Sequence, residues 1–163
     1  MKILNRITLG LLAIVLLACS EDDKTVDQVV ANTERGAVLR TVEIIENSIP
    51  IAIENGQTQT AENAQLSLLL EEQDVDNGGL LQSVDVFIQF VDGSPDTGDS
   101  SAAITEEVFV KNIARDAFTP GPFGLPRTTL TLTAAEMLSK VNLTPDALFG
   151  GDTFRTRLAL NLT

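Results

Sequence analysis

Apolar and polar residues alternate along most of the chain after residue 36, in short runs separated by turn-forming residues. The clearest run has apolar residues at 84, 86, 88 and 90 and polar residues at 83, 85 and 89. A period of two with one polar face is typical of antiparallel sheets. The pattern predicts about seven strands, near residues 37–45, 49–54, 64–72, 81–91, 105–112, 127–132 and 152–162.

Two local patterns predict how these strands are connected. Asp76-Asn77-Gly78-Gly79 is a strong turn sequence, and it predicts a hairpin that joins strands 64–72 and 81–91. Thr133 and Glu136 have the spacing of a capping box ahead of an apolar helical face, so a short helix is expected there. A second helical turn is expected at Thr144, with proline at its first helical position.

These elements predict an all-β domain over residues 36–163. Short strands with Gly-, Pro- and Asp-rich connections favour an immunoglobulin-like antiparallel β-sandwich with one short helix in a crossover. The alternative is an open sheet backed by the helix. Thr163 falls at the edge of the last predicted strand, so we expect these residues to be the front portion of a longer protein.

Residues 1–18 have the composition of a secretory signal peptide. Lys2 and Arg6 form a positive start, an 11-residue apolar run covers 7–17, and small Ala18 precedes Cys19. A helix over that run would span only about half of a ~30 Å hydrocarbon core, which argues against a permanent transmembrane helix. A soluble secreted protein with an incidental cysteine, or an uncleaved anchor, are the alternatives.

The tetrad Leu16-Leu17-Ala18-Cys19 resembles a bacterial lipobox. This resemblance implies cleavage before Cys19, lipidation of its sulfur and acylation of the new amino terminus, so that outer-membrane lipid would be the first partner. Several acyl chains anchor a protein stably where one chain binds only marginally. Cleavage would also remove two cations and leave a more acidic body, which anionic headgroups would repel.

The residues after Cys19 resemble the surface-export signal of Bacteroidota lipoproteins, in which Ser or Lys and two or three acids follow the lipidated cysteine. Here these are Ser20, Glu21, Asp22 and Asp23. The resemblance implies display on the cell surface, and orientation towards the periplasm is the alternative. Residues 19–35 contain few large apolar side chains and no clear period, so they are expected to form a flexible acidic linker.

Composition excludes several function classes. The chain has no His, which removes imidazole bases and Ser-His-Asp triads, and a single Cys, which cannot form an internal disulfide. A net charge of −12 argues against nucleic-acid binding. All aromatic residues are Phe, so the Trp and Tyr platforms usual at sugar sites are missing. We expect no enzymatic activity and no cofactor.

Two acidic clusters are candidate calcium sites. Asp92, Asp96 and Asp99 lie in one predicted loop and could supply three carboxylates. The spacing matches no known calcium loop, and Asp, Gly, Ser and Pro are also what turns require, so a solvated loop is favoured. The second cluster lies at residues 71–77, and its segment Asp74-Val75-Asp76-Asn77-Gly78 only superficially resembles the start of an EF-hand, because it lacks the third acidic ligand and the closing Glu.

Residues 119–126, Thr-Pro-Gly-Pro-Phe-Gly-Leu-Pro, form the most unusual stretch. Its prolines predict a stiff, extended connection. The favoured interpretation is that Phe123 and Leu125 pack under the edge of the sandwich. The alternative is an exposed apolar tip that contacts a partner. Arg127, Arg155 and Arg157 are expected to form ordinary surface salt bridges with the surplus acids.

Segments 118–129 and 150–158, together with the lipobox and the acidic leader, resemble accessory lipoproteins of SusC/SusD-type nutrient transporters, similar in role to the SusE/SusF class. This resemblance implies a non-enzymatic spacer or docking module of an outer-membrane uptake complex, with a SusC/SusD-like pair as partner. It implies no ligand residue, because the sugar platforms of that class use Trp and Tyr. The alternative function is a structural or adhesive surface module, stabilised by calcium at the loop aspartates.

Overall fold

The computed structural model describes residues 36–60, 64–93 and 104–163. Their secondary structure is mostly antiparallel strand, with one α-helix. The elements are β1 (Val38–Ser48), β2 (Ile51–Glu54), β3 (Gln57–Thr60), β4 (Gln65–Gln73), β5 (Leu81–Val91), β6 (Val108–Ala114), η2 (Arg115–Ala117), β7 (Thr119–Pro120), β8 (Pro126–Thr133), α3 (Ala134–Lys140), η3 (Pro145–Ala147) and β9 (Thr153–Leu162).

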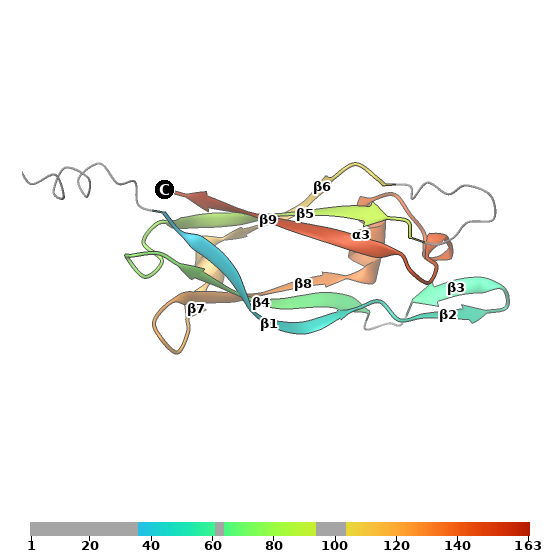
Figure 1. The fold of residues 1–163 in the computed structure, drawn as a ribbon, viewed down its shortest axis with the longest axis horizontal. Helices are drawn as coiled ribbons and strands as arrows, with labels where there is room; N and C mark the ends of the chain where they lie inside the picture. Colours follow the sequence, from blue (N-terminus) through green and yellow to red (C-terminus); the bar gives the residue numbers. More distant parts are fainter. Residues whose placement is uncertain (1–35, 61–63, 94–103) are drawn as a thin grey trace, which may run out of the picture. The chain divides into compact units, whose positions relative to one another are not determined.

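Two sheets face each other and form a sandwich. One has the strand order β1-β4-β8-β7 and the other β6-β5-β9, and Figure 1 shows them as a lower and an upper layer. Strands A, B, E and D of an immunoglobulin-type domain have the first order, and strands C′, C and F have the second. The predicted immunoglobulin-like sandwich is therefore confirmed, and the open sheet is excluded.

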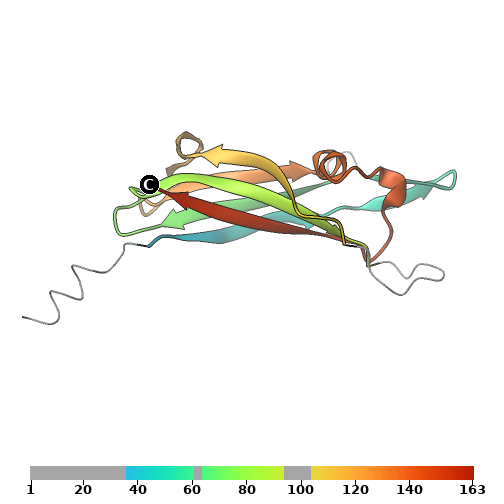
Figure 2. The same cartoon turned by 90° about the horizontal axis from the view of Figure 1, so that it is seen from above.

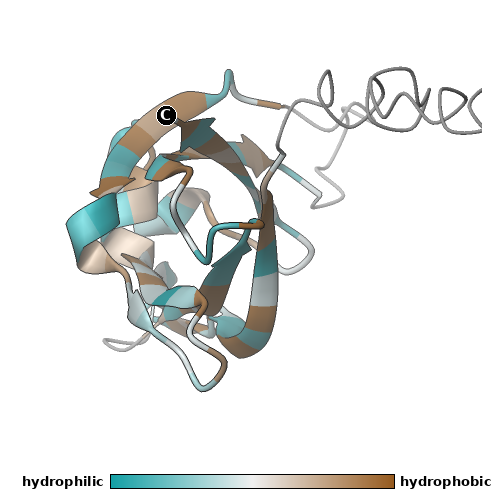
Figure 3. Ribbon diagram, turned by 90° about the vertical axis from the view of Figure 1, so that its left-hand side faces the viewer, coloured by the Kyte–Doolittle hydropathy of each residue, from teal (hydrophilic) through white to brown (hydrophobic). Residues whose placement is uncertain are grey.

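The core lies between the sheets, where the period-two pattern places apolar side chains. On β5, the residues at 84, 86 and 88 are fully buried, while the residues between them lie on the outer face. Figure 3 shows these apolar and polar bands alternating along the strands. Leu70, Leu130 and Leu132 from the opposite sheet complete the same core with Met137 and Leu138 of α3.

The helix forms where the sequence predicted it, in the crossover from β8 to β9. The Thr133 hydroxyl accepts a hydrogen bond from the Glu136 amide at 3.1 Å, which caps the first turn. The second expected turn is the short 3₁₀ helix η3, with Pro145 at its first position.

The hairpin predicted at residues 76–79 is wrong. Asn77 and Gly78 do adopt positive φ angles of 52° and 90°, so the chain turns there. However, β4 and β5 belong to different sheets, so the turn connects the two layers. The Asp74 carboxylate holds it by accepting hydrogen bonds from the amides of Asp76, Gly78 and Leu80 at 2.7–2.8 Å.

A hairpin that was not predicted lies nearby in the sequence. Asn55 and Gly56, with φ angles of 52° and 81°, join β2 to β3 as a separate two-stranded ribbon. Its residue Ile53 is 72% exposed, although the alternating pattern had predicted a strand with one buried face at residues 49–54. The prediction also omitted β7, which pairs with β8 through Thr119 and Pro120 only.

Candidate functional site

The sandwich has two long sides, and one of them is left open by the residues that the structure describes. Figure 2 shows β1 and β9 along the same side, with β6 and β8 along the other. In an immunoglobulin-type sandwich the place beside strand F is filled by strand G. Within the part of the chain that the structure describes, β5 pairs with one edge of β9 and no strand pairs with the other.

Side chains on the inner face of β9 are incompletely covered. Phe154, Leu158 and Leu160 lie opposite Phe90, Val86 and Val84 of β5, so they point into the sandwich. They are nevertheless only half-buried, whereas Val84 and Val86 have no exposed surface. The difference follows from position, because β5 has a neighbour on both edges and β9 has one among the described residues.

The facing edge strand β1 is also poorly covered. Its residue Ile44 pairs with the inward-facing Leu68 of β4 and still is 62% exposed. Val42 and Ile45, at two register irregularities of the same strand, are exposed as well. Towards the other end, Leu39 of β1 and Leu160 of β9 pack on one cluster of buried residues, which closes the two layers there.

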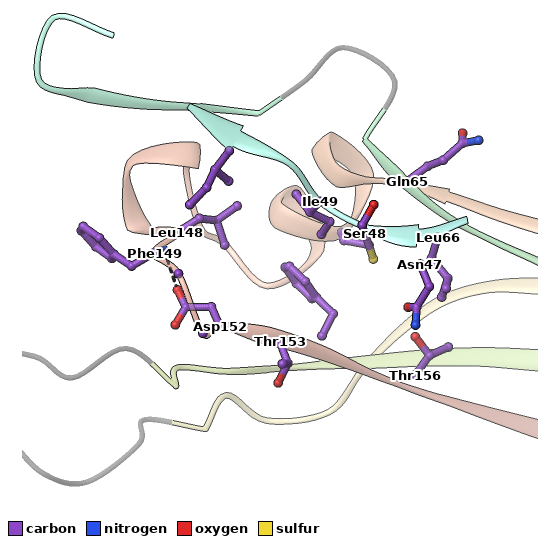
Figure 4. Close-up of a pocket in the computed structure, with 15 residues that line it drawn as sticks. Asn47, Ser48, Ile49, Gln65, Leu66, Leu148, Phe149, Asp152, Thr153 and Thr156 are labelled. Atoms are coloured by element: carbon purple, nitrogen blue, oxygen red, sulfur yellow. Dashed lines mark hydrogen bonds between the residues drawn. The ribbon is translucent and has the colours of Figure 1, made fainter. Parts of the chain in front are cut away.

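Between these edges, near α3, lies a cleft of about 430 Å³ (Figure 4). Its walls come from the end of β1, the start of β4, helix α3 and the start of β9. Apolar lining is supplied by Ile49, Leu66, Met137, Leu148 and Phe154, and polar lining by Asn47, Ser48, Gln65 and Thr156. Figure 4 shows Asn47 and Thr156 pointing toward one another from β1 and β9.

The loop at the mouth of the cleft is fixed by Asp152. Its carboxylate accepts hydrogen bonds from the Phe149 amide at 2.7 Å and the Gly93 amide at 2.9 Å. Gly93 is required there, since a Cβ at this position would lie 2.3 Å from the carbonyl oxygen of Gly151. The loop holds the Phe149 side chain half exposed beside the cleft.

The outer face of β9 is polar and mostly paired. Asn161 and Asn112 donate hydrogen bonds to the two oxygens of Asp85 at 2.9 and 2.7 Å. These hydrogen bonds hold the pKa of Asp85 below its ordinary value, and the one from Asn112 contributes more than the one from Asn161. Arg157 pairs with Glu107 at 2.5 Å and lies 4.0 Å from the centre of the Phe87 ring.

The opposite long side is closed. Lys111 of β6 donates a hydrogen bond to the Thr131 carbonyl of β8 at 2.7 Å, and it forms an ion pair with Glu136 of α3 at 3.6 Å. Helix α3 itself contacts both β6 and β8. A charged side chain directed across the gap and a covering helix are two ways in which proteins protect sheet edges.

Two neighbouring buried acids of β4 have opposite environments. Glu71 forms ion pairs with Arg127 and Arg40. The salt bridge predicted for Arg127 at the surface therefore involves a carboxylate that is fully buried. Burial raises the pKa of Glu71, but the hydrogen bonds and charges of the two arginines outweigh it and lower the pKa.

Glu72 lies on the inner face, opposite Leu39 of β1. Neither of its buried carboxylate oxygens has a hydrogen-bond partner among the described residues. Burial, with the nearby charge of Asp74, raises the pKa of Glu72 to about 7. Sequence patterning had suggested no such difference between Glu71 and Glu72.

The structure brings few of the predicted site residues together. Cys19, Ser20, Glu21, Asp22 and Asp23 lie outside the described residues. Of the calcium candidates, Asp96 and Asp99 also lie outside them, and Asp92 is half-buried directly after β5. Lipidation, export and calcium binding therefore stay predictions.

The stretch 119–126 differs from the favoured expectation. Leu125 is half-buried, but Phe123 is 81% exposed at the tip of the turn between β7 and β8. Gly124, with a φ angle of 79°, forms this turn together with a hydrogen bond from its amide to the Gly121 carbonyl at 3.0 Å. Phe123 is an apolar tip, as the alternative interpretation had it.

The described residues hold no candidate metal site. No three Asp, Glu or Cys side chains lie close enough together to hold a metal ion in the part of the chain that the structure covers. Over the same residues, none of the helices has the length and hydropathy needed to cross a bilayer.

Comparisons with protein-family profiles, with curated proteins and with solved structures find no match to this chain.

Proposed function

We propose that this protein is a non-enzymatic lipoprotein of the outer membrane that serves as a docking module in a SusC/SusD-like nutrient-uptake complex. The observation that carries the docking role is the open side of the sandwich. There, the exposed Ile44 and Val42 of β1 and the half-buried face of β9 flank a cleft of about 430 Å³. An apolar strip of this kind is typical of surfaces that contact another polypeptide.

The anchor and the context of the proposal rest on sequence. The lipobox ending at Cys19 and the acidic residues 20–23 support a lipid-anchored protein displayed at the cell surface. Segments 118–129 and 150–158 resemble accessory lipoproteins of such transporters. Phe123, exposed in the first of these segments, adds a second apolar contact point.

The anchor is tested by fractionation of cells that express the tagged protein or its Cys19→Ala variant. The proposal expects the unsubstituted protein in the outer-membrane fraction and the variant released from it. Retention of the Cys19→Ala variant in membranes would contradict lipidation at this residue.

The docking role is tested by affinity purification of the tagged lipoprotein from gently solubilised outer membranes, with co-purifying proteins identified by mass spectrometry. The proposal expects a SusC/SusD-like pair, and reduced recovery with a variant that carries Ile44→Lys on the open side. Ala114→Lys, at an exposed end of β6, is the matched control. A membrane-bound bait without a transporter pair would favour an adhesive or structural module instead.

A further inference from the structure

The connection between β4 and β5 begins with two acids that have different surroundings. Glu72, opposite the apolar Leu39 of β1, is fully buried, and its carboxylate oxygens have no hydrogen-bond donor among the described residues. Asp74 is half-buried, and its carboxylate accepts hydrogen bonds from the amides of Asp76, Gly78 and Leu80. A buried carboxylate without a donor is costly when it is ionised, whereas the protonated acid is a donor itself.

The cations on the strands that flank β4 do not pair with Glu72. Arg40 of β1 and Arg127 of β8 form ion pairs with Glu71 instead. Arg115 of η2 acts on Glu72 by its charge, but this effect is smaller than those that favour the protonated form. Two further acids at this end of the sandwich are exposed to solvent, namely Asp76 of the turn and Asp116 of η2.

Asp74 acts on Glu72 more strongly than Arg115 does. Burial, then the charge of Asp74 and a hydrogen bond between the two side chains, raises the pKa of Glu72 to about 7. Two ionised carboxylates only accept, so this hydrogen bond requires a proton on one of them. Burial also raises the pKa of Asp74, but the three amide hydrogen bonds outweigh it and lower the pKa. The two carboxyl groups therefore titrate as a pair in which Glu72 keeps the proton.

The turn that Asp74 holds is packed against the rest of the domain. Gly78 lies so close to Pro126, the first residue of β8, that a Cβ on Gly78 would be 2.4 Å from Cγ of the proline ring. The Gly79 carbonyl accepts a hydrogen bond from Arg115 of η2 at 3.3 Å. Figure 1 shows the turn at the same end of the sandwich as the β7–β8 loop. The position of the turn thus depends on Asp74 and on contacts with β8 and η2.

We propose that Glu72 and Asp74 share one proton, that this proton keeps the turn 74–80 packed against Pro126, and that loss of the proton to water releases the turn. After the loss, a buried carboxylate without a donor faces the ionised Asp74, and release lets water reach both groups. A released turn would also uncover Pro126, three residues after the exposed Phe123. This response needs no partner, so it is independent of the proposed docking role.

The direction of the response follows from the pKa of Glu72 in the two states of the turn. The pKa is about 7 in the packed turn, and after release into water it would return to the ordinary value near 4.5. Release is therefore least favoured below pH ~4.5, becomes more favoured as the pH rises, and levels off above pH ~7. Over this range the equilibrium constant for release should increase ~100-fold.

The test is hydrogen exchange of the full-length lipoprotein in detergent, resolved by residue with NMR, in buffers with EDTA so that no cation replaces the proton. The amides of Gly78 and Leu80, which bond to Asp74, should lose ~100-fold in protection between pH 4.5 and 7, after correction for the intrinsic exchange rate. The Leu143 amide, bonded to the Leu138 carbonyl at 2.9 Å in another turn, should keep its protection.

Substitutions in β4 separate the proton from the fold. Glu72→Gln supplies an amide donor at every pH, so the Gly78 and Leu80 amides should stay protected from pH 4.5 to 8. Glu71→Gln, the matched control, keeps Glu72 and should keep the loss of protection. The side-chain carboxyl carbon resonance of Glu72 should titrate near pH 7 in the parent chain and at lower pH in Asp74→Asn. Circular dichroism checks that each variant is folded.

Three results would overturn the inference. The first is equal protection of the Gly78 and Leu80 amides at pH 4.5 and 8 in the parent chain. The second is a loss of protection that persists in Glu72→Gln. The third is exchange of these two amides only as slowly as the core amides of β5, because the turn would then open only when the whole domain unfolds.

Discussion

The two long sides of this sandwich are both built from antiparallel strands, and they differ in how well their edge strands are covered. On the β6/β8 side, α3 covers the gap and Lys111 bonds the Thr131 carbonyl across it. On the β1/β9 side, the apolar residues of both edges are half-buried or exposed around a cleft. The closed side is stabilised by contacts within the domain, whereas the open side keeps apolar surface that no other described residue covers.

The largest effect is expected from removing apolar side chains on each side. Leu138→Ala, in the buried face of α3, should lower the free energy of unfolding by ~3 kcal/mol, because it leaves a cavity in the core. Leu158→Ala on β9 should cost only ~1 kcal/mol, since its side chain already is half exposed to solvent. Urea unfolding measures both, and equal costs would show that the β1/β9 side is covered.

The buried Glu72, which lies opposite Leu39 of β1, should make the stability of the fold depend on pH in an unusual way. Its pKa is about 7 in the folded chain, against an ordinary value near 4.5, so the folded state holds this proton more tightly than the unfolded one. The stabilisation is complete below pH ~4.5 and is lost as the pH rises through ~7. Glu72→Gln should therefore be more stable than the unsubstituted protein at pH 8, by ~1–2 kcal/mol, and equal to it near pH 4.5.

Glu71→Gln is the matched control for that experiment. The same substitution one residue earlier weakens the pairs with Arg127 and Arg40, so it should destabilise the protein at pH 8. Thermal unfolding at pH 4.5, 6 and 8 compares the two variants with the parent chain. A Glu72→Gln variant less stable than the parent at pH 8 would mean that the Glu72 carboxylate has a partner.

Opening the closed side should have a smaller effect. Lys111→Met removes the donor to the Thr131 carbonyl and the charge directed across the gap, at a cost of ~1 kcal/mol. Lys140→Met, at the exposed end of α3, should be neutral within ~0.5 kcal/mol. If both variants unfold at the same urea concentration, Lys111 does not close this side.

The smallest effect on the isolated protein is expected at Ile44. Because its side chain is largely exposed on β1, Ile44→Thr should change the free energy of unfolding by less than ~0.5 kcal/mol. The same substitution should still reduce recovery of the partner in affinity purification, since a partner docked on the open side would cover this residue. A large loss of stability would place Ile44 in the core of the isolated domain.

Alternation along the chain was enough to predict the sandwich and the inner faces of β5 and β9. The Thr133 and Glu136 pattern also located α3, because capping is decided by residues close in sequence. Pairing between strands is decided by the whole fold. The sequence at 76–79 therefore predicted the change of chain direction correctly. The strand pairing inferred from it was wrong, since β4 and β5 lie in different layers.

The candidate site was harder to predict for a similar reason. Asn55-Gly56 is a two-residue turn sequence that could have revealed the β2–β3 hairpin. Other features of the site depend on residues that are distant in the sequence. These features are the different environments of Glu71 and Glu72 and the edge of β9 that no described strand covers. Leucines alternate in the same way in a strand that is covered and in one that is not, so the sequence pattern does not distinguish the two cases.

Residue-resolved hydrogen exchange of the free lipoprotein tests the open side most directly. The account predicts that the β9 amides bonded to β5 are protected like those of β5 itself, and that the amides between them, on the free edge, exchange orders of magnitude faster. Protection of every amide from 154 to 161 in the free protein would contradict it, because another segment would then already occupy this edge.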